Sequence, residues 1–301
     1  MTDYSDRSIF QKIVTHPVFL LIAGIVIVIA FMAAAGAILR VAIPGPAQSA
    51  VEELIGYSLI SAFCILGYWV FTRFVERKPF ADFAWPGAGK EWLFGIAVGA
   101  GVMSLVVGVI ALFGGYKIVG YNGADVLIGV LGVAIISGFT EEILFRGIIF
   151  RFFEQWLGSY AALTISALFF GFVHLDNPNS SWLAAFAIAV EAGIMLGAVY
   201  MLTRRLWAAI GLHMAWNSVQ GGVFGIPVSG TDVPGLLVSR TSGSDLLTGG
   251  AFGAEASLPA IILCTAIGVY FFLRAKQKGQ VVAASFHRFK TGTVAADSPA
   301  F

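Results

Sequence analysis

The sequence contains few charged residues for its length. Aspartate, glutamate, lysine and arginine make up 12% of its 301 residues, whereas soluble globular domains carry about 25%. Hydrophobic residues account for 58%, and the mean hydropathy is +0.87. The scarcity of charge excludes an ordinary soluble globular protein and predicts an integral membrane protein. The net charge of +1 and the lack of a dense basic cluster also argue against a nucleic-acid partner.

Cysteine and the common hydrolase motifs are scarce as well. The two cysteines, Cys64 and Cys264, lie in apolar runs, which predicts packed thiols and neither a disulfide framework nor a metal site. The zinc-protease motif HExxH is absent, and the histidines His174 and His213 fall on different predicted helices. The GxSxG motif of serine hydrolases is absent too. We therefore expect neither a metal nor a cofactor.

Long apolar runs dominate what is present. A helix needs about 20 apolar residues to cross the hydrocarbon core of a membrane. Since lipid tolerates helices but not open sheets, the runs predict an all-α polytopic membrane protein with about eight transmembrane helices. We expect one domain over residues 1–301, with its motifs within about 126–222 and a mobile tail over about 279–301. The predicted spans are residues 17–39, 54–72, 92–114, 126–150, 160–175, 182–202, 206–226 and 258–273.

The basic residues indicate an orientation. With eight crossings and the N-terminus inside, all but three of the 18 lysines and arginines fall on the inner side, the exceptions being Arg40, Lys117 and Arg240. Cytoplasmic segments of membrane proteins carry such an excess. Both termini are therefore predicted to be cytoplasmic, with the chain in the plasma membrane or, in a bacterium, the inner membrane. Membrane lipid is thus an expected partner.

Six polar residues stand out because they lie within the apolar segments. An ionisable side chain in the hydrocarbon core costs roughly 2.5–3.5 kcal/mol on insertion scales, so such groups face a partner, a cavity or a reaction. Two carboxylates, two imidazoles, one guanidinium and one carboxamide at membrane depth predict a single buried site. The six residues are Glu141, Glu142, Arg146, His174, His213 and Asn217.

Helical spacing separates the roles of the two glutamates. Glu142 and Arg146 are four residues apart, which places a carboxylate and a guanidinium on one helix face. Arg146 keeps its proton and therefore needs such a partner when buried. Glu141 points about 100° away from Glu142 and has no local counter-ion, which suits a general base. The alternative is that both glutamates serve a structural ion-pair network.

His174 is predicted to stand level with Glu141. A turn at Leu157-Gly158 folds the two helices back on each other, and each residue then lies about 24 Å from the turn, at ~1.5 Å per residue. A carboxylate and an imidazole at equal height can jointly activate a water molecule. Phe170, one turn before His174, is expected to shield this site from water, although ordinary packing explains it equally well.

His213 and Asn217 share one face of a later helix. An imidazole N–H and a carboxamide NH₂ aimed at one point form an oxyanion hole, whereas interhelical hydrogen bonding is the structural alternative. The predicted membrane depths of the two histidines conflict. His174 is predicted near the outer end of its helix, and His213 only about 12 Å from the inner end of its own. A bent helix carrying Glu141, or a turn projecting beyond the membrane, reconciles them.

In their order along the chain, these motifs resemble those of the CAAX prenyl endopeptidase and bacteriocin-processing family, also called CPBP or Abi. No single motif is specific, but the ordered set on apolar helices is. The resemblance covers about residues 126–222, and the other segments match in hydropathy alone. The motifs are EExxxR (Glu141, Glu142 and Arg146), FxxxH (Phe170 and His174) and HxxxN (His213 and Asn217).

The resemblance implies an intramembrane glutamate-dependent endopeptidase. Glu141 is then the general base on water, helped by His174, while His213 and Asn217 hold the tetrahedral oxyanion. The other two residues of the first motif are interpreted as a supporting ion pair. Eukaryotic members cut the last three residues from prenylated CaaX proteins, and bacterial members have processing, maturation or immunity roles. The implied substrate is a membrane-associated protein or peptide, with or without a lipid group.

Two other functional classes remain open. One is a non-catalytic immunity or partner-binding protein on the same scaffold, and the other is a proton-coupled transporter, where buried glutamate and histidine also occur. The lack of a two-fold hydropathy repeat and of a Gly/Pro-broken helix pair argues against the transporter. Glu191, isolated in the sixth segment, either lines a substrate cavity or bonds a neighbouring helix, and the sequence assigns it no catalytic role.

Overall fold

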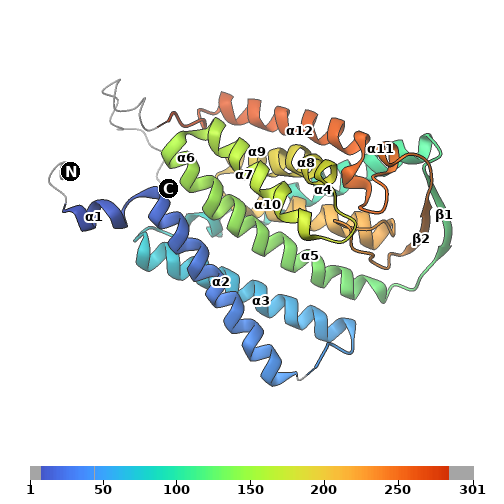
Figure 1. Ribbon diagram of the computed structural model, residues 1–301, viewed down its shortest axis with the longest axis horizontal. Helices are drawn as coiled ribbons and strands as arrows, with labels where there is room; N and C mark the ends of the chain where they lie inside the picture. The colour runs from blue at the N-terminus through green and yellow to red at the C-terminus, as the bar shows by residue number, and fades with distance from the viewer. Residues whose placement is uncertain (1–7, 44, 285–301) are drawn as a thin grey trace.

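The computed structural model describes residues 8–43 and 45–284, and these are mainly helical (Figure 1). The α-helices are α1 (Ile9–Val14), α2 (Pro17–Ala42), α3 (Ala50–Val70), α4 (Ala88–Leu112), α5 (Val126–Glu142), α6 (Arg151–Leu157), α7 (Ser159–Val173), α8 (Trp182–Ile188), α9 (Ile194–Thr203), α10 (Leu206–Asn217), α11 (Asp245–Thr248) and α12 (Leu258–Gln277). Short π or 3₁₀ segments are η2 (Phe71–Val75), η3 (Ala81–Phe83), η4 (Ile143–Phe150), η5 (His174–Asp176), η6 (Ala189–Gly193), η7 (Ser218–Val223) and η8 (Ala254–Ala256).

Within the described residues, seven helical segments are long and apolar enough to cross a membrane. They are Pro17–Ala42, Ala50–Val75, Ala88–Leu112, Val126–Leu157, Ser159–Asp176, Trp182–Thr203 and Leu258–Gln277. They correspond to seven of the predicted spans, so the all-α polytopic membrane architecture is confirmed.

The remaining predicted span, residues 206–226, forms a helix that other helices enclose. Its residues build α10 and η7, which carry His213, Asn217 and Gln220 and are not among the seven apolar helices. Every residue of α10 except Trp207 is buried. A helix that is enclosed by other helices presents no surface to lipid, so it can carry the polar side chains of a site.

The α10 helix packs closely against α4 through glycine. A Cβ atom added to Gly95 or Gly99 would overlap a backbone carbonyl of α10, and one added to Gly211 would overlap a carbonyl of α4. Small residues of this kind let the backbones of membrane helices approach one another. The contact fixes the height and rotation of the helix that carries His213 and Asn217.

The helix that carries the two glutamates is longer than a membrane core. The elements α5, η4 and α6 run without a break over 32 residues, or about 48 Å at 1.5 Å per residue, compared with a hydrocarbon core of about 30 Å. Even at a tilt of about 40°, one end extends beyond the core.

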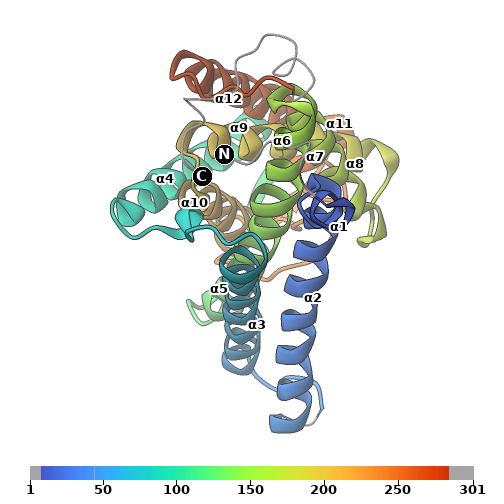
Figure 2. The same ribbon diagram turned by 90° about the vertical axis from the view of Figure 1, so that its left-hand side faces the viewer.

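A small antiparallel sheet was not predicted. Strand β1 (Tyr116–Tyr121) pairs with β2 (Leu237–Thr241). The strands lie at one end of the helix bundle, and α1 and the last turns of α12 lie at the other (Figure 1). The sheet ties the segment before α5 to the long loop between η7 and α12. Helices α2 and α3 project from the rest of the bundle, as the second view shows (Figure 2).

Buried ion pairs hold the end of the bundle opposite the sheet. Arg151 in α6 donates to both carboxylate oxygens of Glu76, at 2.8 and 2.6 Å. Arg204, at the end of α9, donates to both oxygens of Glu154 in α6. The end of the long helix is thereby fixed to the segment after α3 and to α9.

The chain after α12 contacts the same end of the bundle. The Val282 amide donates to the Ser159 hydroxyl at 2.8 Å, and the Val282 carbonyl accepts from the Ser159 amide at 2.9 Å. Val282 falls within the predicted tail, whose residues 285–301 lie outside the described part of the chain.

Candidate active site

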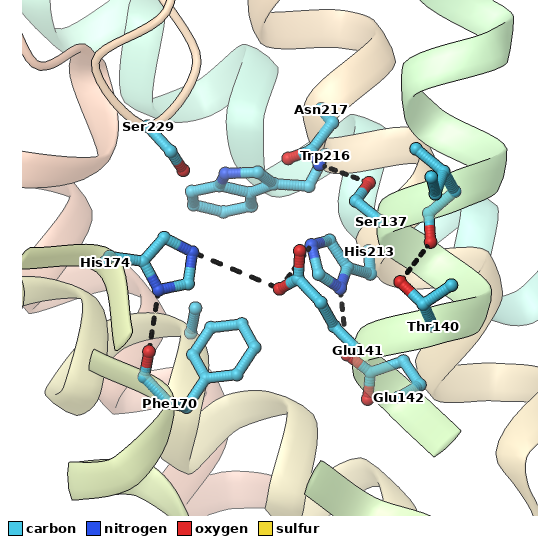
Figure 3. A network of polar contacts seen from close by, with 12 residues as sticks. Ser137, Thr140, Glu141, Glu142, Phe170, His174, His213, Trp216, Asn217 and Ser229 are labelled. Carbon is cyan, nitrogen blue, oxygen red and sulfur yellow. Dashed lines mark hydrogen bonds and ion pairs between the residues drawn. The ribbon is translucent and has the colours of Figure 1, made fainter. Parts of the chain in front are cut away.

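The six predicted polar residues meet in one cluster, in which Glu141 alone is partly exposed. Figure 3 shows Glu141, Glu142, His174, His213 and Asn217. The glutamates come from the last turn of α5, at the point where its hydrogen bonding changes to the π pattern of η4. Such π segments are frequent at functional sites. The first histidine lies where α7 passes into η5, and the second histidine and the carboxamide come from α10. The cluster consists of Glu141, Glu142, Arg146, His174, His213 and Asn217.

Glu141 faces both histidines. Its Oε2 atom lies 4.0 Å from His174 Nε2 and 4.0 Å from His213 Nε2. This oxygen has no hydrogen-bond partner, and 28% of the side chain is exposed. A separation of 4.0 Å is too long for a direct hydrogen bond, but a water oxygen about 2.8 Å from each atom of either pair fits between them. The predicted juxtaposition of Glu141 with His174 is therefore present, and His213 joins it.

The ring of His174 is held by the backbone of its own helix. Its Nδ1 atom lies 2.6 Å from the carbonyl oxygen of Phe170. A carbonyl only accepts hydrogen bonds, so Nδ1 carries the proton and Nε2 of the neutral ring presents its lone pair toward Glu141. The Phe170 ring centre lies 5.1 Å from that of His174 and 6.0 Å from that of His213. Phe170 therefore packs beside both imidazoles.

Glu142 is the fully buried centre of a second set of contacts. Its Oε1 atom accepts from Arg146 Nη1 at 2.9 Å, so the predicted ion pair is confirmed. The same oxygen lies 2.8 Å from His213 Nδ1, a contact that was not predicted. Arg146 also lies 4.4 Å above the Phe170 ring. Glu142 thus fixes Nδ1 of His213 as a donor and directs Nε2 toward Glu141.

Asn217 is oriented by α5. Its Nδ2 group donates to the Ser137 hydroxyl at 2.9 Å, and Ser137 donates to the Val133 carbonyl at 2.9 Å. This uses one of the two amide hydrogens of Asn217 and leaves the other for a ligand. Ser137 was not predicted as a site residue, although it lies four residues before Glu141 and therefore on the same helix face.

Two further residues of the site, Ser229 and Glu255, come from the long loop before α12. Glu255 accepts from the backbone amide of Ser229, and its Oε2 lies 3.5 Å from Trp216 Nε1. No spacing in the sequence indicates these contacts, because they depend on how the loop folds back over the helices. Among the described residues, no group of three or more histidines, cysteines or acidic residues could hold a metal ion.

Fold and site together define a class: a polytopic membrane protein with a partly exposed carboxylate that faces two buried imidazoles. Residues 123–219 match the family described as type II CAAX prenyl endopeptidase Rce1-like. The match covers about a third of the chain, and the matched region contains all six residues of the cluster. No curated protein and no solved structure matches the chain.

Proposed function

We propose that the protein is an intramembrane endopeptidase that hydrolyses a peptide bond with water activated by Glu141. The observation that carries this proposal is the position of Glu141 Oε2, unpartnered and 4.0 Å from both histidine Nε2 atoms. A water molecule between Glu141 and His174 can lose a proton to the carboxylate as its oxygen attacks the scissile carbonyl. The carboxylate can then give that proton to the departing amine.

His213 and Asn217 are proposed to stabilise the developing oxyanion. Asn217 offers its second amide hydrogen. His213 donates from Nε2 only when its ring is doubly protonated, since Nδ1–H already faces Glu142. The buried carboxylate of Glu142 stabilises that cationic ring, so the charge opposite the oxyanion is positive. Arg146 and Phe170 support the arrangement by fixing Glu142 and by packing beside both imidazoles.

The substrate is proposed to be a membrane-associated protein or peptide, with or without a lipid group. The family match over residues 123–219 and the position of the cluster among apolar helices support this class. Both termini are proposed to face the cytoplasm, based on the distribution of basic residues.

Purified protein in detergent or lipid vesicles, incubated with membrane peptides, tests the function. We expect wild-type protein to cleave at least one peptide and Glu141→Gln to cleave none while retaining its elution profile and thermal stability. Glu53→Gln, which changes an exposed carboxylate on α3, is the matched control and should cleave as wild type does. Equal cleavage by Glu141→Gln would rule out the proposed base. A cellular phenotype that survives Glu141→Gln would favour the non-catalytic partner-binding protein.

A further inference from the structure

A small cavity adjoins the catalytic cluster on the side of the loop before α12. His174, His213 and Asn217 form part of its wall, and Ile188, Met195 and Leu212 supply apolar surface. Its volume of about 20 Å³ suits a single water-sized group, since roughly 10–15 Å³ accommodates one water molecule. Two carboxylates that have no role in the proposed hydrolysis, Glu191 and Glu255, also line this space.

Glu191 is the most unusual group in this cavity. Its side chain belongs to η6, and the residue is only 1% exposed. Neither carboxylate oxygen has a hydrogen-bond partner. The polar neighbour on α12 is the thiol of Cys264, which is a weak donor. A buried carboxylate without a partner is costly, so its acceptors are available to a group that enters the cavity.

Glu255 is only partly satisfied and brings a second carboxyl group. The Ser229 amide donates to one oxygen, and the Trp216 indole approaches the other at 3.5 Å. Burial raises the pKa of the Glu255 carboxyl, while the hydrogen bond from the Ser229 amide lowers it. A cation that enters the cavity therefore favours the ionised form of this residue.

The charges around the cavity are unbalanced. Four carboxylates lie in or beside the site, whereas the permanent cation among them, Arg146, is already paired with Glu142. Within the described residues, no lysine or arginine forms a salt bridge with Glu191 or Glu255. His174 is the titratable group that acts on Glu255 from the catalytic side. A positively charged group that enters this space therefore meets no competing lysine or arginine from the described part of the chain.

We infer that this cavity is an ammonium-binding subsite, in which Glu191 and Glu255 receive a primary ammonium group of the peptide substrate. This inference rests on the proposed peptidase function. A –NH₃⁺ group has about the size of a water molecule and three donors for carboxylate oxygens. A planar guanidinium is larger and does not fit the free volume.

The ammonium group has two chemical sources. One is a lysine side chain next to the scissile bond. The other is the new α-amino group of the departing fragment: hydrolysis breaks the C–N bond, forms a C–O bond, and transfers one water proton through Glu141 to the nitrogen. At neutral pH the amine takes a second proton from the new carboxylic acid and becomes an ammonium ion. Both sources place the same group beside His174.

The first measurement requires no cleavage. A hydrophobic tripeptide with a free α-amine and its N-acetylated form are compared for binding to wild-type protein at pH 7, below the α-amino pKa of about 7.7–8.0. We expect the free-amine peptide to bind about tenfold or more tightly, in line with the loss caused by unpairing a buried charge. The second measurement compares kcat/KM for substrates with lysine or norleucine beside the cleaved bond, and we expect a similar preference for lysine.

Glu191→Gln and Glu255→Gln show whether either preference arises in this cavity. Glutamine keeps the shape of the side chain and removes its charge. The ratio of the two peptide affinities and the ratio of the two kcat/KM values should therefore fall toward one in each variant. Both ratios should remain unchanged in Glu53→Gln. A preference in one measurement alone identifies the source of the ammonium group. The subsite is ruled out if wild-type protein shows neither preference, or if a preference persists in both variants. If the free-amine peptide binds more tightly but no substrate is cleaved, the subsite is supported and the peptidase function is rejected. If substrates are cleaved without any preference for an ammonium group, the peptidase function is supported and the subsite is rejected.

Discussion

Two groups of buried charges in this protein are arranged in opposite ways. At the α6 end of the bundle, both carboxylate oxygens of Glu76 and of Glu154 have donors. In and beside the candidate active site, Oε2 of Glu141 and both oxygens of Glu191 have none. An unpaired buried polar group costs about 1–3 kcal/mol, so the first group stabilises helix ends while the second keeps acceptors free. Glu142 lies between the two groups, since its Oε1 contacts Arg146 and His213 while its Oε2 has no hydrogen-bond partner.

The largest expected effects come from removing one charge of each kind. Glu141→Gln should abolish nearly all turnover, a loss of at least about 10²–10⁴-fold for a general base, with little change in thermal stability. Glu154→Gln should lower thermal stability and leave turnover per folded molecule nearly unchanged, since it removes the charge that the buried pair with Arg204 requires. Cleavage kinetics and apparent Tm, measured on both variants, check the contrast. A large loss of thermal stability in Glu141→Gln would contradict the distinction between a reactive and a structural glutamate.

Arg146 tests whether a structural pair lies inside the site. Arg146→Ala leaves Glu142 buried and unpaired, so we expect a destabilisation of about 3–5 kcal/mol and a lower folded yield. The double change Glu142→Gln with Arg146→Met should restore yield. Turnover should stay low, because Glu142 also orients His213 at 2.8 Å. Folded yield by size-exclusion chromatography and turnover per folded molecule are the measurements, and an Arg146→Ala protein as stable as wild type would contradict the structural role.

Asn217 is expected to have a smaller effect, confined to catalysis. Asn217→Ala removes a donor to the oxyanion, so kcat should fall by about 10²–10³-fold, and Asn217→Asp should fall further because it adds negative charge there. Ser137→Ala frees the amide that it orients and should lower kcat less than Asn217→Ala does. Separate kcat and KM values with one defined peptide are required. An unchanged kcat with a raised KM would assign Asn217 to substrate binding.

The smallest expected effect is that of metal removal. Activity should survive EDTA or phenanthroline, because the proposed base is a carboxylate and no group of three or more histidines, cysteines or acidic residues among the described residues could hold a metal ion. The measurement is the cleavage rate before and after chelation, with zinc added back. Loss of activity followed by recovery with zinc would make His174 and His213 ligands and would replace the proposed mechanism.

Local spacing predicted the contacts that a single helix determines. The pair of Glu142 and Arg146 follows from four-residue spacing, and the matched height of Glu141 and His174 follows from counting residues on either side of a turn. The partner of Glu142 across the bundle, His213, could not be predicted in this way. It depends on how α10 is rotated against α5, which packing among many helices decides.

Sequence patterns could not predict the contacts of Glu255 for a related reason. Glu255 lies 38 residues after Asn217 in the printed sequence, and its approach to Trp216 depends on the path of the loop that β2 and β1 hold in place. Ser137 is a different case, because it shares a helix face with Glu141 and a search for polar residues on that face would have found it. The apolar periodicity predicted the spans well, since lipid constrains each of them separately.

The glycine contact between α4 and α10 limits which substitutions this sequence can accept during evolution. At Gly95, Gly99 and Gly211 the smallest possible change, one added methyl group, meets a backbone oxygen of the opposite helix, and a backbone atom cannot rotate aside as a side chain can. Alanine, the usual neutral replacement elsewhere, is therefore the first substitution that selection removes here. We expect homologous chains to vary freely on the lipid-facing sides of these helices and to keep all three glycines wherever the helix carrying the two polar groups retains its position.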